Sequence, residues 1–348
     1  MIDFQRTQEV YDALTHLPRV NLVMLPTPFQ ELTHLSASLG DVRIFMKRDD
    51  LCDIALTGTK GRMLELRLGR AAEQKADVLI GGWAAQSNHS RQIAAAAARV
   101  GMECYLVLRH VPGVSDVPSR GNLLLDELFG ARVEILSEET SAEDQERRKK
   151  QIADELRRSG RNPYITGYED DLNALGAMLC GLEMYRQCAE EFSVIPDYLF
   201  CSSANTTHAG LLLATSWLNL PTEVIAVQHG WPCDGTANER VRKSCRQALD
   251  LLGPTYDVQL GNVKQLDEYF GARYGDLTAE TSEAIALLGK LEGIILDPVY
   301  TGKAMAAVID YIRTGKIRSG KTVAFVHTGG FPALFAYNNP LSIATRQD

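Results

Sequence analysis

Lys60 is the residue of this sequence best suited to covalent chemistry. It follows Thr57-Gly58-Thr59, where glycine allows a sharp turn, and it begins a predicted helix that runs to about Lys75. An amine at a helix N-terminus lies near the positive end of the helix dipole, which favours its neutral form. A neutral amine condenses with an aldehyde to give a Schiff base. Taken alone, the segment fits better a solvated lysine in a first helical turn, so this assignment depends on the rest of the chain.

A second polar cluster, residues 86–92, lies at the start of an alanine-rich predicted helix that runs from Ser87 to about Val100. Ser87 fits two roles equally well: its hydroxyl caps the helix, or it takes part in catalysis. Asn88 and His89 fall in the first turn, close to any ligand bound at that helix end. The density of polar groups before such an apolar helix favours a functional cluster.

A third candidate is the loop Ser203-Ala204-Asn205-Thr206-Thr207, within the polar segment 202–207 that separates a predicted strand from a predicted helix. Its small and hydroxylated residues leave backbone N–H groups open to an anion. The loop lacks the lysine of a nucleotide-binding P-loop, so the single phosphate of a cofactor fits better than a nucleotide. On its own the loop also fits an ordinary strand-to-helix turn.

A fourth candidate, Thr328-Gly329, follows the last predicted strand. The Thr328 hydroxyl can hydrogen-bond a ring nitrogen without protonating it, and the glycine leaves room for a flat ring. Tyr300 and Thr301 stand in a predicted tight turn; for Tyr300, as for Tyr274, a core tyrosine is the simpler interpretation. A lysine for a Schiff base, a loop for a phosphate and a hydroxyl for a ring nitrogen together indicate pyridoxal 5'-phosphate. That cofactor is an electron sink for a carbanion at the α carbon of an amino acid.

The elements that must position these residues alternate along the chain. Because short apolar strands alternate with helices, we predict an α/β fold of two open, twisted, mainly parallel αβα lobes that bind ligands at the carboxyl ends of strands. The break between the lobes is placed at 167–172, where acidic residues and glycine replace apolar ones. The predicted strands are 42–47, 77–80, 104–108, 132–136, 163–166, 198–201, 224–227 and 322–327, and the predicted helices are 8–17, 60–75, 87–100, 119–129, 137–158, 174–192, 208–218, 238–252 and 279–291.

Composition narrows the class of protein. The chain has 348 residues, 45% of them hydrophobic, and a formal net charge of -8, which argues against a nucleic-acid partner. It contains no apolar run long enough for a membrane span and no signal-peptide pattern at its start. Its seven cysteines include no Cys-x-x-Cys pair, which predicts reduced thiols in a cytoplasm and neither a disulfide framework nor a metal site.

The order of these motifs resembles the D-cysteine desulfhydrase / 1-aminocyclopropane-1-carboxylate deaminase family. The resemblance runs from residues 25–28 to 332–337, nearly the whole chain. It is carried by seven ordered motifs: Lys60-x-Arg62-x-Leu64-Glu65, Gln86-Ser87-Asn88-His89-x-Arg91-Gln92, Asn173-Ala174-Leu175-Gly176, Thr207-His208-Ala209-Gly210, Leu291-Glu292-Gly293-Ile294, Asp297-Pro298-Val299-Tyr300-Thr301-Gly302-Lys303 and His327-Thr328-Gly329-Gly330.

The resemblance implies a homodimeric pyridoxal phosphate enzyme of fold type II, similar to the tryptophan synthase β subunit. A small αβ domain, 52–165, is then inserted in a larger domain made of 1–51 and 166–348. Lys60 is implied to hold the cofactor and to shuttle protons, and Ser87, Tyr274 and Tyr300 to be the other catalytic residues. The remaining implied residues are Asn88 on the cofactor ring hydroxyl, 203–207 on its phosphate, Thr301, Thr328 and Gly329 around its ring, and Ser87, Asn88, His89, Trp83 and Tyr300 around the substrate.

Two threonines bear on the reaction. The deaminase branch resembles Tyr-Glu-Gly and His-Leu-Gly-Gly where this chain has Thr301 and Thr328 in the second positions. A carboxylate near the ring nitrogen favours its protonated form, so neutral threonines imply a milder electron sink that suffices to expel a thiol. The resemblance thus implies β-elimination of a small β-substituted amino acid, D-cysteine first, to a keto acid and ammonia.

Five features depart from the family pattern: Thr57-Gly58-Thr59 replaces Gly-Gly-Asn, Met63 replaces a lysine, Trp83 replaces a small residue, 170–172 replaces Gly-Gly-Ser, and 204–206 replaces a glycine loop. Because Trp83 and the acidic pair are expected near the substrate, a bulkier or cationic substrate stays open. So do cyclopropane ring opening, β-replacement or isomerisation on an unusual amino acid, and a non-catalytic sensor that binds pyridoxal phosphate.

Overall fold

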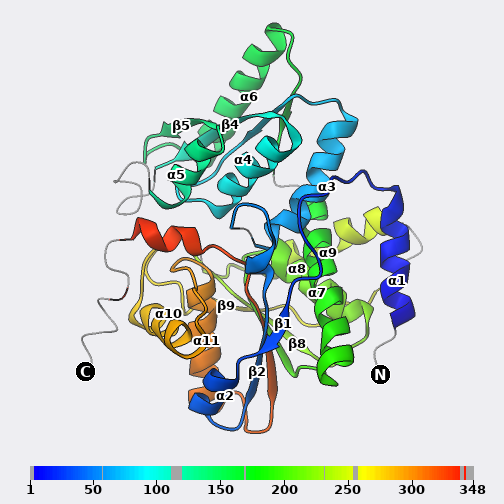
Figure 1. Cartoon of the computed structure of the whole chain (residues 1–348), viewed down its shortest axis with the longest axis vertical. Coiled ribbons are helices and arrows are strands. Elements are labelled where there is room, and N and C mark those ends of the chain that lie inside the picture. Colours follow the sequence, from blue (N-terminus) through cyan, green and yellow to red (C-terminus); the bar gives the residue numbers. More distant parts are fainter. Residues whose placement is uncertain are drawn as a thin grey trace.

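Two sheets divide the strands of the protein (Figure 1). The computed structural model describes residues 4–56, 58–110, 120–167, 170–230, 232–253, 258–337 and 341. A four-stranded, fully parallel sheet has the order β5-β4-β3-β6: β3 (Val78–Gly81), β4 (Glu103–Arg109), β5 (Arg132–Leu136) and β6 (Pro163–Ile165). A six-stranded sheet has the order β1-β2-β10-β7-β8-β9: β1 (Phe29–Glu31), β2 (Arg43–Lys47), β7 (Tyr198–Ser202), β8 (Glu223–Val227), β9 (Lys264–Leu266) and β10 (Thr322–Val326). In the larger sheet β1 is antiparallel to β2, and the other pairings are parallel.

Helices cover both faces of each sheet, as the alternation of buried strand residues requires. In β3, Leu79 faces the core shared with α3, α4 and α5, whereas Val78 and Ile80 face α6. In the larger sheet, α7, α8 and α9 pack on one face and α2, α10 and α11 on the other. The helices are α1 (Phe4–Ala13), α2 (Thr33–Leu39), α3 (Lys60–Glu73), α4 (Asn88–Val100), α5 (Gly121–Leu128), α6 (Ala142–Arg158), α7 (Asp170–Phe192), α8 (Thr206–Trp217), α9 (Ala237–Leu252), α10 (Ala279–Glu292) and α11 (Thr301–Arg313).

Close helix packing sets the position of α3 between the lobes. Gly176 of α7 lies directly against Met63 of α3, because a Cβ at Gly176 would stand 2.9 Å from the Met63 backbone nitrogen. Gly210 of α8 lies equally close to α7, where a Cβ would stand 2.2 Å from the carbonyl oxygen of Ala174. Glycine removes the side chains that would separate these helices, so α3, α7 and α8 form one tightly stacked unit.

A buried ion-pair network holds the first turn of α3. Arg62 donates to both oxygens of Asp49, at 3.0 and 2.9 Å, and to both oxygens of Glu183, at 3.1 and 2.7 Å. Lys47 completes it with bonds of 2.6 Å to Glu183 and to the carbonyl oxygen of Thr27. Burial raises the pKa of Asp49, but the charge and hydrogen bonds of Arg62 outweigh burial and hold that pKa well below its usual value. The lysine that follows Thr59 is thereby carried on a fixed helix.

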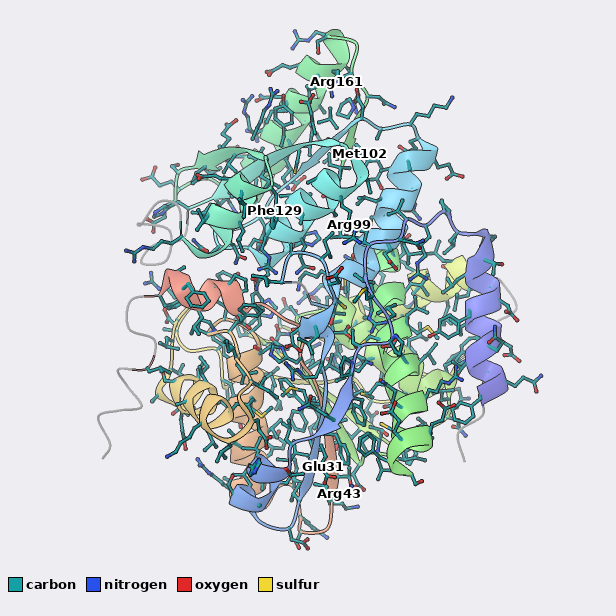
Figure 2. All side chains as sticks on the ribbon, in the orientation of Figure 1. Glu31, Arg43, Arg99, Met102, Phe129 and Arg161 are labelled. Carbon is teal, nitrogen blue, oxygen red and sulfur yellow. The ribbon has the colours of Figure 1, made fainter. Side chains whose placement is uncertain are left out.

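Exposed ion pairs lie elsewhere. Figure 2 shows Glu31 and Arg43 side by side at the end of the larger lobe, far from the small lobe, and Arg43 Nε lies 2.8 Å from Glu31 Oε1. Pairs of this exposed kind contribute about 0 to 1 kcal/mol each. They stabilise the surface and leave the position of α3 unaffected.

The α/β fold with mainly parallel sheets is confirmed, and so is each predicted strand, with ends shifted by one residue at most where they differ. The sequence analysis did not predict β1, α2, β9 or α11. Five predicted helix starts were wrong by two residues or more: α1 begins at Phe4, α5 at Gly121, α6 at Ala142 after its cap Ser141, α7 at Asp170, and α8 at Thr206. The acidic residues placed at the break between lobes therefore start a helix; residues 168 and 169 lie outside the described part of the chain.

None of the seven cysteines, all of which the structure describes, forms a disulfide. Within the described ranges, none of the helices combines the length and apolar character needed to cross a bilayer, and no group of His, Cys, Asp or Glu side chains is arranged to hold a metal ion.

Candidate active site

A cavity of about 260 Å³ opens where the carboxyl ends of strands from both sheets meet. In the larger sheet Val326 pairs with Cys201, and Ser202 pairs with Val227, so the residues after β7, β8 and β10 emerge at one edge. The cavity is lined by Lys60, Met63, Trp83, Ser87, His89, Asn173, Ser202, Ser203, Ala204, Asn205, Thr206, Thr207, His229, Tyr300 and Thr328. Most of the site residues predicted from the sequence therefore lie in one place: Lys60, Trp83, Ser87, His89, residues 203–207, Tyr300 and Thr328.

Lys60 begins α3, as predicted, and its half-buried amine faces the cavity. Burial lowers the pKa of Lys60 to about 8; the charge of Asp297 opposes this shift and that of Arg91 adds to it. The predicted bias toward the neutral amine is thus confirmed, with burial as its main cause. Gly58 positions the lysine turn, because a Cβ there would stand 1.8 Å from the carbonyl oxygen of Thr328. Glycine is what allows the Lys60 turn to rest on the end of β10.

Ser87 does cap α4: its Oγ accepts a hydrogen bond of 3.2 Å from the backbone nitrogen of Ser90, while the residue also lines the cavity. The two roles expected for it are therefore compatible. His89 Nε2 lies 3.2 Å from Nη1 of Arg67. Since a guanidinium only donates, Nε2 accepts and the neutral ring carries its proton on Nδ1. Burial and then the charge of Arg67 hold the pKa of His89 well below its usual value, in keeping with a neutral ring.

Asn88 lies behind the cavity wall. Its Oδ1 accepts from Arg91 Nη1 at 3.1 Å and from Asn122 Nδ2 at 3.0 Å, which fixes the orientation of its amide. Gly330, at a φ of 110°, lies between Asn88 and Asp297: a Cβ there would stand 2.8 Å from Asn88 Nδ2 and 3.0 Å from Asp297 Cγ. Asn88 is thus held at the boundary of the lobes, next to the glycines that follow β10.

The N-terminus of α8 forms the opposite end of the cavity. Ser203 Oγ accepts from the backbone nitrogens of Asn205 and His208, at 3.2 and 3.1 Å, and so holds the loop in a tight turn. Thr206 and Thr207, in the first turn of α8, line the cavity. The sequence analysis missed Ser202, which ends β7 one residue before the predicted loop. Its buried Oγ lines the cavity and has no hydrogen-bond partner among the described residues.

The rings of Tyr300 and His229 form the remaining wall, and Tyr274 lies behind it in contact with both. The hydroxyls of Tyr274 and Tyr300 lie 2.5 Å apart, and the Tyr300 ring centroid lies 5.8 Å from Lys60 Nζ. The ring of His229 lies 4.7 Å from that of Tyr300. Burial raises the pKa of Tyr274 to about 12, against the hydrogen bond from Tyr300, and burial lowers the pKa of His229 to about 3, helped by the charges of Lys60 and Lys303. The sequence analysis missed His229, although it is a polar residue just beyond the predicted strand 224–227, the signal that found the other loops.

Thr301 was expected beside the cofactor ring, but it does not line the cavity. It starts α11, and its hydroxyl bonds to Asp297 Oδ1 at 2.7 Å. Asp297 is fully buried and accepts further bonds from the backbone nitrogens of Val299, Tyr300 and Thr301. Thr301 therefore fixes the start of α11 behind the wall that Tyr300 faces. It is not one of the residues that line the cavity, and neither are Asn88, Tyr274 and Gly329.

Thr328 lines the cavity at the end of β10. Gly329 has a φ of 83°, and its nitrogen donates to His327 Nδ1 at 3.2 Å, so that Nε2 of the neutral His327 ring donates to the carbonyl oxygen of Ile295. This pair of bonds fixes the turn on which Thr328 is presented. Asp171, by contrast, lies 3.6 Å from Arg70 and does not line the cavity.

These residues fit pyridoxal phosphate. The cavity has a lysine with a lowered pKa, a neutral hydroxyl on Thr328, and a helix N-terminus flanked by hydroxylated side chains that suits a phosphate. The unpartnered hydroxyl of Ser202 is a donor that a phosphate oxygen would satisfy. Fold and site together define a pyridoxal-phosphate dependent enzyme of fold type II.

Comparison with known proteins agrees with this class. The family described as pyridoxal-phosphate dependent enzyme matches residues 20–329, and the chain belongs to that family. It is 37% identical over 333 residues to D-cysteine desulfhydrase of Klebsiella pneumoniae (strain 342), covering 93% of this chain and 98% of the relative. It is 36% identical over 329 residues to D-cysteine desulfhydrase of Salmonella typhi, with the same coverage of both chains.

The fold is also similar to those of solved structures. The crystal structure of an ACC deaminase homologue superposes with a TM-score of 0.83 at 32% identity, covering 96% of this chain and 99% of that chain. The processed form of threonine deaminase isoform 2 from Solanum lycopersicum has a TM-score of 0.65 at 15% identity, covering 94% of this chain and 84% of that chain, which shows a shared fold. The protein is a pyridoxal-phosphate dependent lyase that catalyses β-elimination, and its cofactor is pyridoxal 5'-phosphate.

Proposed function

We propose that the protein cleaves a small β-substituted amino acid, with D-cysteine as the first candidate, to sulfide, a keto acid and ammonia. The observation that carries this proposal is the neutral hydroxyl of Thr328 at the end of β10, in a cavity whose amine is Lys60. When bound, pyridoxal phosphate supplies an electron sink for the α carbon. A neutral partner for its ring nitrogen gives a milder sink, which suffices for a thiol leaving group.

The position of each side chain in the cavity suggests its role in the reaction. Lys60 Nζ, whose pKa is lowered to about 8, takes the α proton while the bond between the β carbon and the thiol sulfur breaks, and it then gives the proton to the β carbon of the unsaturated product, which water hydrolyses. Ser87 Oγ, at the start of α4, orients the substrate carboxylate, together with the N–H groups of the first turn that holds Asn88 and His89. Tyr300, hydrogen-bonded to Tyr274, lies on the Lys60 side of the cavity and donates a proton toward the leaving group.

The cofactor is held by groups at three places. The N-terminus of α8 with residues 203–207 holds the phosphate, Asn88 orients the ring hydroxyl, and Thr328 accepts or donates at the ring nitrogen. Thr301 and Gly329 act on this ring through the turns that they fix. The domain boundaries follow the sheets: 52–165 contains the four strands of the smaller sheet, and 1–51 with 166–348 contains those of the larger.

The test is product analysis on the holoenzyme with D-cysteine, L-cysteine and 1-aminocyclopropane-1-carboxylate. We expect sulfide and pyruvate in equal amounts from D-cysteine, and none with Lys60→Ala. Oxobutyrate from the cyclopropane as the preferred reaction would support the ring opening suggested by the ACC deaminase homologue instead. A spectral response to amino acids without release of any keto acid would support a sensor, for which Met63 in the cavity wall is the main argument.

We also propose a cytoplasmic homodimer. Its interface includes the exposed apolar side chains of Leu124 and Leu128 on α5 and Phe335 on η3 (Phe331–Ala336), which are 49%, 71% and 62% exposed. Figure 1 shows η3, in red, beside α5. The free thiols suit a reducing compartment. Light scattering on the purified protein should give twice the 38.4 kDa chain mass, and Leu128→Asp should lower it; cell fractionation tests the compartment.

A further inference from the structure

Contacts with β4 and α6 fix the backbone of Trp83. The preceding Gly82 has a φ of 125°, and a Cβ there would stand 2.0 Å from the carbonyl oxygen of Val107. The carbonyl oxygen of Trp83 accepts from the Arg109 backbone nitrogen at 2.7 Å and from Gln145 Nε2 at 2.9 Å. Two bonds to its carbonyl oxygen, together with a turn that only glycine tolerates, leave the Trp83 backbone little freedom.

The Trp83 side chain is braced as well. The guanidinium carbon of Arg109 lies 4.6 Å from the centroid of the indole ring, a cation–π contact. Arg109 ends β4 and Trp83 lies just after the neighbouring strand β3, and the next residue, Ala84, forms a bridge with Arg109. The indole is therefore a fixed surface, and it lines the cavity.

Tyr300 and His229 of the larger lobe line the same cavity, and Tyr300 is fixed by its bond to Tyr274. The cavity of about 260 Å³ lies below the roughly 300 to 1,000 Å³ of usual ligand pockets. The cofactor needs part of this volume, so the fixed indole borders the limited space that remains for a substrate side chain.

We propose that Trp83, braced by Arg109, is the specificity-determining residue that restricts the substrate to amino acids with one small β-substituent. This rests on the proposed function, because it assumes that an amino acid enters the cavity. The bulkier substrate that Trp83 suggested at the sequence level is thereby excluded. No acidic residue lines the cavity in the described part of the chain, so a cationic side chain would find no ion-pair partner there.

The test uses ligands without a leaving group, so that binding is separated from elimination. Alanine and phenylalanine of each hand are titrated into the holoenzyme, and the change in cofactor absorbance gives a Kd for each. For the enantiomers that bind, we expect the wild type to have a lower Kd for alanine than for phenylalanine. Trp83→Ala should shift the ratio of the two Kd values toward phenylalanine by about tenfold or more, and Trp83→Phe by a smaller factor. Arg109→Met should shift it by about two- to fivefold, the worth of a cation–π brace.

Arg132→Met is the matched control. Arg132 stacks over Tyr105 at 5.0 Å on the same sheet, and neither residue lines this cavity. We expect its ratio to equal that of the wild type. A ratio unchanged in both Trp83 variants would overturn the proposal, as would an equal shift in Arg132→Met. A wild type that binds alanine but forms no keto acid from any β-substituted amino acid would overturn the proposed function alone, and one that binds neither ligand would overturn both.

Discussion

Two polar regions lie side by side on the first turn of α3, and they differ in how completely their groups are hydrogen-bonded. Arg62 faces the network of Asp49, Glu183 and Lys47, in which both carboxylates accept several bonds and opposite charges balance. Lys60, two residues earlier, faces a cavity where the buried hydroxyl of Ser202 has no partner among the described residues. The first region can only hold the structure together. The second has groups available for a ligand, which is where binding energy can be gained.

Lys60→Ala should have the largest effect, and it should be on chemistry alone. Removing the amine abolishes both the attachment of the cofactor and the proton transfer, so kcat for elimination should fall by on the order of 10³-fold or more. The folded protein should be as stable as before or more so, because a buried amine costs stability. Absorbance of the bound cofactor, kcat and urea unfolding measure this, and a variant with more than a tenth of the wild-type kcat would refute the role of Lys60.

Arg62→Met should give the reverse result. It leaves Asp49 and Glu183 buried with Lys47 as their one remaining cation in the network, which should cost about 3 to 5 kcal/mol of unfolding free energy. Under conditions where the variant is folded, the cofactor absorbance should keep its wavelength, since Arg62 does not line the cavity. Urea unfolding of the protein without cofactor makes the measurement. A loss below about 1 kcal/mol would mean that the network stabilises no more than a surface ion pair.

The same contrast explains what the sequence predicted. Lys60, Ser87, the 203–207 loop and Thr328 follow directly from local rules, because each stands where a predicted strand or turn meets a helix or a glycine. Asn122 of α5 holds the site through a bond to Asn88, far away in sequence, so no local pattern marked it. The helix α11 was missed because the segment around Tyr300 and Thr301 was interpreted as a tight turn, although the bond between Thr301 and Asp297 stands at the start of a helix.

Asp126 tests the comparison of the two regions, because its carboxyl group lacks hydrogen bonds although the residue does not line the cavity. This residue of α5 is fully buried, and neither carboxyl oxygen has a partner among the described residues. Burial raises the pKa of Asp126 to about 8, although the charge of Arg91 opposes this. The unfolded chain loses that proton near pH 4, so between about pH 4 and 8 the folded state binds more protons and its stability falls as pH rises.

Asp126→Asn removes this titration and keeps the shape of the side chain. We expect the variant to be more stable than the wild type by roughly 2 to 4 kcal/mol at pH 8, with the difference vanishing toward pH 4. Urea unfolding across this range measures it, and kcat at pH 7 should change little. If instead the variant lost activity at all pH values, a buried group that lacks hydrogen bonds would be functional outside the cavity as well. The difference between the two polar regions would then not be confined to the cavity.

Ser202→Ala should have the smallest effect and sharpen the comparison most. In the protein without cofactor its hydroxyl has no partner to lose, so the unfolding free energy should stay within about 0.5 kcal/mol of the wild type. If that hydroxyl serves a phosphate oxygen, the Kd for pyridoxal phosphate should rise about tenfold, the loss of one hydrogen bond to a charged group.

Ser244→Ala is the matched control, because Ser244 Oγ already donates to Asn205 Oδ1 at 3.1 Å beside the same loop. Its stability should fall by about 1 kcal/mol while the Kd changes less than in Ser202→Ala. The same pattern in both variants would mean that hydrogen-bond satisfaction does not separate the two regions.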